Sequence, residues 1–202
     1  MATCFVSVMG NEFSALVSVL TAVLHAIGLY SRHWSVLIQD HRRVDGGMTG
    51  AWHDHRHFGG EQRFEGLWRT CVKNTTGIVE CLTIRHVPGW LLCVQILVCL
   101  SFGGALLSAL MKLLYHFNPF CNSRRIVAGF VMMSFLDAFM LLFAVSIYAT
   151  NYGERYMLSL SSLHHLVCRL SWSFVIETIA MVFSVASGSL ALCTIRREYT
   201  EI

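Results

Sequence analysis

A histidine-rich stretch is the first group of side chains in this sequence with the chemistry of a binding site. Its alternating pattern would place His53, His55 and His57 on one side of an extended strand. Imidazoles grouped in this way bind zinc or make a loop sensitive to acid. Gly59 and Gly60 follow the stretch directly, as in a solvated polar insertion without a ligand. We favour this second interpretation and expect no metal site.

Serine and histidine, the pair used in nucleophilic catalysis, also lie close together at Ser161, Ser162, His164 and His165. Proximity in sequence is insufficient without a group that orients the histidine. The chain also has no phosphate-binding glycine loop and no dinucleotide fingerprint. We therefore expect no enzymatic activity, no cofactor and no nucleic-acid partner.

Two of the eight cysteines, Cys71 and Cys81, lie in runs with β-strand character, residues 64–73 and 77–84. The turn-forming stretch between the runs predicts a hairpin. Opposite residues in a hairpin lie about 4.5–5.5 Å apart, which suits a disulfide that an oxidising compartment would preserve. The alternative is a pair of free thiols.

The turn contains the only N-x-[ST] sequon in the chain, Asn74-Thr75-Thr76. Such a sequon is glycosylated only on the lumenal side of a membrane. Together with the cysteine pair, Asn74 predicts that this segment lies outside the cell, although a chance sequon is the alternative.

The other cysteines are less informative. Cys121 and Cys193 are expected, with Cys4, near the cytoplasmic face, where a thiol can be S-acylated. An unmodified thiol is the simpler interpretation of each. Cys93 and Cys99 are expected to pack inside an apolar segment.

The last three residues, Thr200, Glu201 and Ile202, match the [ST]-x-Φ pattern of a class I PDZ ligand. A PDZ domain binds such a tail as an added strand, with the carboxylate in a backbone nest and the final apolar side chain in a pocket. We expect a PDZ scaffold as a partner, although short patterns of this kind also occur by chance.

Four long apolar segments would position these groups. They cover about residues 13–30, 90–111, 126–149 and 171–195, and each approaches or exceeds the ~20 residues that a helix needs to cross a bilayer. The whole chain is 55% hydrophobic and only 13% charged, whereas soluble domains are about 25% charged. The sequence predicts one four-span domain over residues 1–202 in the lipid bilayer. The first segment is expected to be retained, because residues 1–12 lack the Lys or Arg of a signal peptide.

Basic residues predict the orientation. The short connection between the second and third segments carries Lys112, Arg124 and Arg125, and Arg196 and Arg197 follow the fourth segment. An excess of Lys and Arg in short loops marks the cytoplasmic side. Both termini are therefore expected in the cytoplasm, with loops 31–89 and 150–170 outside and a cytoplasmic tail at 196–202.

Three ionisable residues fall within the apolar segments: His25, Asp137 and Glu177. Ionisable side chains are costly in hydrocarbon, so they should face the interior of the bundle. They would then form either hydrogen bonds between helices, the interpretation that we favour, or part of an ion pathway or intramembrane partner contact.

The first loop also carries an ordered motif, with Trp34, then Gly66-Leu67-Trp68, then Cys71 and Cys81. This W…GLWxxC…C order resembles the signature of the claudin superfamily, which includes peripheral myelin protein 22, the epithelial membrane proteins and the calcium-channel gamma subunits. The 32 positions from Trp34 to Gly66 are more than in typical claudins, and the stretch from Cys81 to the second segment is shorter. The branch is therefore left open.

The resemblance implies an all-α membrane protein, a left-handed four-helix transmembrane bundle with a small antiparallel sheet from the first extracellular loop. In that fold the Trp34 and Gly66-Leu67-Trp68 positions seat the sheet on the membrane, and the Cys71–Cys81 disulfide joins two of its strands. A small sheet lacks enough core to be stable alone, and a disulfide contributes about 2–4 kcal/mol.

The resemblance also implies a function. We expect a structural protein of the plasma membrane at cell–cell junctions, where like molecules assemble side by side and across the gap. The alternative is an auxiliary, gamma-like subunit that modulates an ion channel or receptor in the same membrane.

Overall fold

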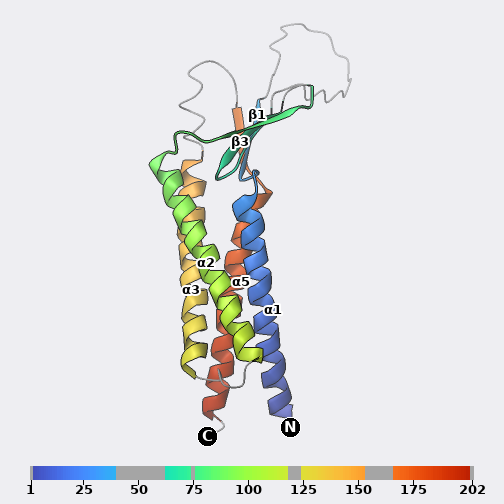
Figure 1. Cartoon of the computed structure of the whole chain (residues 1–202), viewed down its shortest axis with the longest axis vertical. Coiled ribbons are helices and arrows are strands. Elements are labelled where there is room, and N and C mark those ends of the chain that lie inside the picture. Colours follow the sequence, from blue (N-terminus) through green and yellow to red (C-terminus); the bar gives the residue numbers. More distant parts are fainter. Residues whose placement is uncertain (1, 40–61, 74–75, 118–123, 153–165, 201–202) are drawn as a thin grey trace, which may run out of the picture.

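The computed structural model describes residues 2–39, 62–73, 76–117, 124–152 and 166–200. Four helices dominate the fold: α1 (Ala2–Tyr30), α2 (Gly89–Phe117), α3 (Arg124–Asn151) and α5 (Trp172–Thr200). They run side by side, with a sheet at one end of the bundle and both chain termini at the other (Figure 1). The predicted architecture of four helices and a small sheet is confirmed.

Each helix has 28 or 29 residues. At 1.5 Å per residue this is about 43 Å, more than the ~30 Å of a hydrocarbon core. Each helix contains a window long and apolar enough to cross a membrane: Phe13–Tyr30, Gly89–Tyr115, Ile126–Asn151 and Trp172–Cys193. All four predicted apolar segments lie within these helices, apart from the first residue of the fourth segment. The helices also continue past them.

The sheet has five strands: β1 (Ser35–Gln39), β2 (Gln62–Glu65), β3 (Arg69–Lys73), β4 (Val79–Thr83) and β5 (Leu166–Leu170). Their order is β4-β3-β2-β1-β5, and every neighbouring pair is antiparallel. Four of these strands come from the first loop, as expected, and β5 comes from the second long connection. That strand is only five residues long, and it pairs with a strand more than 120 residues earlier in the chain, so its pairing with β1 is a tertiary contact.

The run 64–73, interpreted from the sequence as one strand, is two strands. Gly66, Leu67 and Trp68 form a tight turn between β2 and β3, in which the Gly66 amide donates to the Arg69 carbonyl at 2.9 Å. β2 and β3 then pair with each other. The predicted hairpin between the two cysteines is β3 and β4, and its turn contains Gly77 with a φ of +82°.

Lys112 was also assigned wrongly. The sequence placed it in the connection between the second and third segments, but α2 continues to Phe117 and Lys112 lies inside the bundle with 2% of its surface exposed. The residues around a lysine near the end of an apolar segment do not distinguish a loop from a helix that continues. Lys112 therefore does not count toward the basic residues that predict the orientation.

α5 continues as a helix to Thr200, so residues 196–200 of the predicted tail are helical. Glu201 and Ile202 lie outside the described residues.

Candidate functional site

The end of α1 receives hydrogen bonds from two tryptophans. The indole Nε1 of Trp34 donates to the carbonyl oxygen of Gly28 at 2.8 Å, and that of Trp68 donates to Leu29 at 3.0 Å. The last carbonyls of a helix have no partner within the helix, so they need donors from elsewhere. Two tryptophans that are far apart in sequence provide them. The same contacts fix β1 and the turn after β2 to the end of the first span.

The Gly66-Leu67-Trp68 turn is also fixed to α2. Leu67 is fully buried, and its carbonyl oxygen accepts a hydrogen bond from the Gln95 Nε2 at 2.6 Å. At Gly66, a Cβ atom would lie 2.7 Å from the Cα of Arg32 and 2.7 Å from the Ser31 oxygen. Only glycine allows this approach of two backbones, which explains why the turn begins with it.

An aromatic cluster joins the sheet to α3 and α5. The buried Trp34 ring packs edge-on against Tyr148, with centroids 4.9 Å apart, and against Phe174 at 6.3 Å. The Tyr148 hydroxyl donates to the Ser35 Oγ at 3.0 Å. Edge-to-face pairs at these distances are favourable beyond their buried area. Trp34 therefore contacts α3, α5 and the end of α1.

The disulfide between Cys71 and Cys81 joins β3 to β4, where the two residues are directly opposite. This prediction is confirmed. Cys71 is buried, and the Arg32 Nη1 lies 3.6 Å from the Cys81 Sγ. Through the disulfide, the outer strand β4 is connected covalently to the strand that follows the anchored turn.

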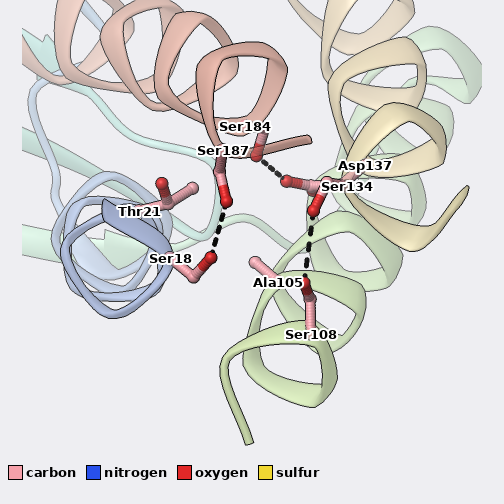
Figure 2. Close-up of a pocket in the computed structure, with 8 residues that line it drawn as sticks. All are labelled: Ser18, Thr21, Ala105, Ser108, Ser134, Asp137, Ser184 and Ser187. Carbon is pink, nitrogen blue, oxygen red and sulfur yellow. Dashed lines mark hydrogen bonds between the residues drawn. The ribbon is translucent and has the colours of Figure 1, made fainter. Parts of the chain in front are cut away.

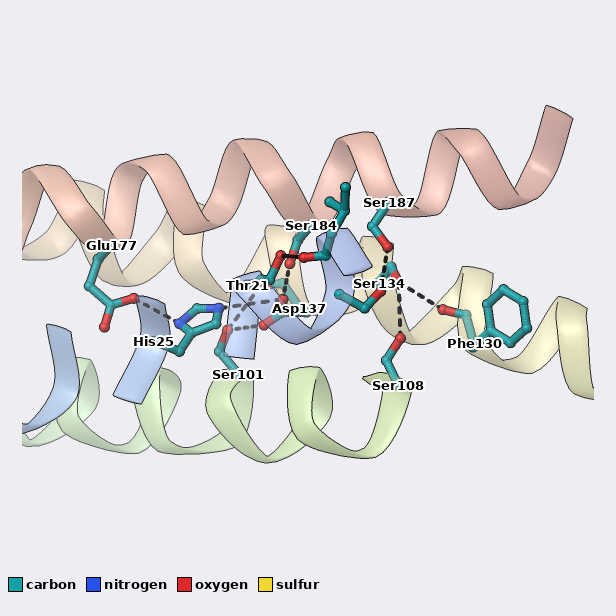
Figure 3. Close-up of polar contacts among 12 residues, drawn as sticks. Thr21, His25, Ser101, Ser108, Phe130, Ser134, Asp137, Glu177, Ser184 and Ser187 are labelled. Atoms are coloured by element: carbon teal, nitrogen blue, oxygen red, sulfur yellow. Dashed lines mark hydrogen bonds and ion pairs between the residues drawn. The ribbon is translucent and has the colours of Figure 1, made fainter. Parts of the chain in front are cut away.

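A second group of polar side chains lies inside the bundle. His25 of α1, Asp137 of α3 and Glu177 of α5 are all buried, and His25 lies between the two carboxyl groups. The His25 Nδ1 lies 2.8 Å from the Glu177 Oε2, and the His25 Nε2 lies 3.5 Å from the Asp137 Oδ2 (Figure 3). The Asp137 carboxylate also accepts hydrogen bonds from the hydroxyls of Ser101 and Ser184. These contacts join all four helices.

Lys112 lies in a neighbouring cluster of hydroxyls. Its Nζ donates to Ser18 at 2.6 Å, to Ser14 at 3.2 Å and to Ser187. It also lies over the Phe130 ring, 5.0 Å from the centroid. Charged groups within a bilayer are tolerated when they face the protein interior and find polar partners.

A small cavity lies between the two clusters (Figure 2). The space inside it that the centre of a water molecule can occupy is about 10 Å³. The residues that line it are Ser18, Thr21, Ala105, Ser108, Ser134, Asp137, Ser184 and Ser187. A polar cavity of this size has room for about one water molecule. The buried polar side chains thus form a nearly continuous track along the bundle, which we call the polar track.

Comparison with protein families agrees with this architecture. The model of the PMP-22/EMP/MP20/Claudin family matches residues 12–191. The chain belongs to this family. The match includes all five strands and nearly all of the four spans, so this claudin-family chain is a multi-pass membrane protein. A search of the curated proteins found no match.

The polar track of this claudin-family chain follows a regular spacing that sequence analysis did not use. Its residues recur at alternating intervals of four and three, together with buried apolar residues. The positions are 14, 18, 21 and 25 in α1, 101, 105, 108 and 112 in α2, 130, 134, 137 and 141 in α3, and 177, 180, 184 and 187 in α5. These intervals average close to the 3.6 residues of one helical turn, so each set lies on one face of its helix. This spacing would have placed Lys112 and the serines inside the bundle.

Glycines of α2 and α5 differ in how closely the neighbouring helices approach them. Gly188 packs closely, since a Cβ there would lie 3.3 Å from Ser134 and Phe135. At Gly103 and Gly104 a Cβ would meet nothing within 4 Å, so neither brings two helices of this chain together.

The remaining predicted site residues do not gather at one place. Cys193, Cys93 and Cys99 are exposed free thiols on α5 and α2. Thr200 is the last residue of α5. Outside the described residues lie Asn74, Cys121, Glu201, Ile202 and the histidines at 53, 55 and 57. In the part of the chain that the structure describes, no group of three or more His, Cys, Asp or Glu side chains is arranged to hold a metal ion.

Proposed function

We propose that this chain is a structural protein of cell–cell junctions, in which the sheet contacts like molecules outside the cell and the C-terminus binds a PDZ scaffold inside it. Family membership supports the general class of membrane protein. The orientation follows from the Asn74 sequon and from the basic residues near the ends of α3 and α5.

One observation carries the extracellular part of the proposal. Strand β4 forms an edge of the sheet, and all five of its residues are exposed. Apolar side chains on and beside it point into solvent, with Ile78 60% and Leu82 74% exposed. An edge strand presents unpaired backbone amides and carbonyls, and proteins normally protect such edges with charge or cover. An apolar edge that is rigidly attached to the membrane domain is a surface for another protein.

The rigidity of the sheet also supports an adhesive role. The sheet is fixed by the two tryptophan contacts to α1, by the Leu67 contact to Gln95 of α2 and by the Tyr148 contact to β1. A surface that is already ordered loses little conformational entropy on binding. Weak contacts repeated between many copies can then hold two membranes together.

The cytoplasmic part depends on the last three residues. A PDZ domain binds its ligand as a strand, so the last turn of α5 must unwind for Thr200 and Ile202 to be read. Helix ends fray readily, which makes this change inexpensive. The docked domain would lie very close to the membrane.

The experiment mixes cells that express tagged protein with cells that do not, and images the border. Enrichment only where two expressing cells touch supports the proposal. Leu82→Glu and Ile78→Glu should abolish this enrichment while the protein still reaches the surface. His86→Glu is the matched control, because it adds the same charge at an exposed position outside the strand. Equal enrichment in all variants would contradict the role of β4.

A separate variant tests the tail. Ile202→Ala should remove PDZ scaffolds from the crosslinked neighbours, because the apolar pocket of the domain is left empty. Glu201→Ala is the control, since the middle position of the pattern is not read. Unchanged scaffold crosslinking in the Ile202 variant would exclude the PDZ interaction without affecting the test of β4.

A second candidate, an auxiliary subunit of a channel or receptor, is favoured by a groove between α2 and α3. This groove, of about 380 Å³, includes Gly103 and Gly104 among its lining residues. Small residues allow a helix of another protein to approach closely within a membrane. Diffuse membrane signal with a channel subunit as the dominant crosslinked neighbour would support this function over the junctional one.

A further inference from the structure

A hollow of about 370 Å³ lies where α1 ends below the outer strands of the sheet. It is lined by Tyr30, Ser31, Arg32, Trp68, Arg69 and Cys81. These residues come from the end of the first span, the turn before β3, the first residue of β3 and the middle of β4. The junctional role proposed above assigns no ligand to them.

Two arginines give the hollow a positive charge. Arg32 and Arg69 are both exposed, and no Asp or Glu is among the lining residues. Glu80 precedes Cys81 in β4, so its side chain points to the opposite face of the sheet. The Arg32 guanidinium contacts the Cys81 Sγ, which is a weak acceptor. Most of the five N–H donors of Arg32 are therefore left for a ligand. Paired guanidinium groups are well suited to the oxygens of a phosphate.

The depth of the hollow matches the membrane surface. Tyr30 is the last residue of the first span, and its side chain is 79% exposed. Trp68 is 38% exposed, and its indole is held in place by the bond to the Leu29 carbonyl. Tyr and Trp are enriched at the level of lipid headgroups, because their rings have one apolar and one polar part.

An exposed apolar stripe on α1 leads to the hollow. It consists of Phe13, Leu16, Leu20, Val23 and Ile27, which are followed at the same spacing by Tyr30. Residues three and four apart in a helix lie on one face, so the stripe is continuous over about 25 Å at 1.5 Å per residue. This is the length over which an acyl chain could lie against the helix.

We propose that the hollow binds a phospholipid from the leaflet on the sheet side of the membrane. The phosphate lies between the Arg32 and Arg69 guanidinium groups, Tyr30 and Trp68 flank the headgroup, and an acyl chain follows the α1 stripe. The lipid fills the space beneath the disulfide-linked hairpin and connects the sheet to the bilayer.

The test uses the full chain in maltoside detergent, titrated with phosphatidylcholine and followed by native mass spectrometry. Arg69→Gln should weaken phosphatidylcholine binding about tenfold, and Arg32→Gln with Arg69→Gln about a hundredfold if the two contacts add. The matched control is Arg85→Gln with Arg169→Gln, which removes the same charge from exposed positions outside the hollow. The control should bind as the wild type does.

Two further probes separate the ligand sources. Diacylglycerol, which lacks the phosphate, and inorganic phosphate, which lacks the chains, should each bind at least tenfold more weakly than phosphatidylcholine. Equal binding of diacylglycerol would overturn the role of the arginines, and equal binding of inorganic phosphate would overturn the role of the lipid. Equal loss in the control pair, or no loss in the Arg69 variant, would also overturn the proposal. The Arg69 variant stays informative if the double variant fails to fold.

Discussion

The indole nitrogen of Trp34 donates a hydrogen bond to the carbonyl oxygen of Gly28, with 2.8 Å between the two atoms. Gly28 is also the residue against which Glu177 packs, since a Cβ at Gly28 would lie 2.3 Å from the Glu177 Oε1. One residue of α1 therefore contacts both the sheet and the polar track. Changes in either part should affect the stability of the other.

The Trp34 contact can be tested without a large loss of volume. Trp34→Phe keeps an aromatic ring but removes the donor, and the buried Gly28 carbonyl is left unsatisfied. We expect a loss of about 1–3 kcal/mol in the free energy of unfolding, the range for an unsatisfied buried polar group. Thermal unfolding in detergent measures it. Trp172→Phe, at an exposed position, should change little, and equal losses in both variants would exclude a specific role for the hydrogen bond.

The close approach at Gly28 makes a second prediction. Gly28→Ala must displace Glu177 from His25, so we expect a destabilisation of about 1–3 kcal/mol, as for overpacked cores. Gly103→Ala is the control, because a Cβ there meets nothing within 4 Å. That variant should be neutral or more stable by up to about 1 kcal/mol, since alanine favours a helix. Thermal unfolding of both variants in detergent measures these changes in stability. A Gly28 variant as stable as the wild type would contradict the close packing of Glu177 against Gly28.

Asp137 is the acceptor that joins the largest number of helices in the polar track. Asp137→Asn keeps the shape but replaces one acceptor oxygen by an amide donor, so a hydrogen bond from Ser101 or Ser184 is lost. A buried polar group left unsatisfied costs about 1–3 kcal/mol. We expect lower thermal stability and less protein at the cell surface. Ser146→Ala, at an exposed position on the same helix, is the control. An Asp137 variant that unfolds at the temperature of the wild type would show that the track contributes little to stability.

The disulfide should be required for maturation. Cys71→Ser removes the bond to Cys81, and such bonds contribute about 2–4 kcal/mol in small folds. We expect most of the surface expression to be lost, as measured by labelling intact cells. Cys99→Ser, which changes an exposed free thiol of α2, is the control. Normal maturation of the Cys71 variant would show that folding does not require the disulfide between β3 and β4.

His33 predicts a pH dependence. Its ring lies 5.0 Å from Phe64 and 5.5 Å from Trp172 between centroids. Partial burial, and then the charge of Arg32, lower the pKa of His33 below its ordinary value of 6.5. The unfolded chain then binds the proton more readily, so this part of the stability is present above pH 6.5 and is lost as the pH falls through the folded pKa. The unfolding temperature of the wild type should fall below pH 6.5 more steeply than that of His33→Gln; parallel profiles would contradict this.

Much of the fold could be read from local patterns. The four spans were predictable because a bilayer requires about 20 apolar residues in a row, whatever their neighbours are. The hairpin of Cys71 and Cys81 was predictable because turn residues lie between two short runs with β-strand character. The motif of Trp34 and Gly66-Leu67-Trp68 indicated the family because its order along the chain is itself the signal.

Lys112 and Arg32 show what only the tertiary structure decided. Whether a lysine near the end of an apolar segment lies in a loop or inside a bundle depends on how far its helix continues and how the helix is rotated. In this chain the rotation brings it to the hydroxyls of three serines from two other helices. Arg32 and Arg69 come together because a turn and a disulfide bring β3 and β4 over the end of α1.

The sequence by itself determined which segments enter the membrane and which cysteines pair, since hydrophobicity and turn chemistry are local. Contacts between segments depend on rotation and register, and these are set by packing of the whole chain.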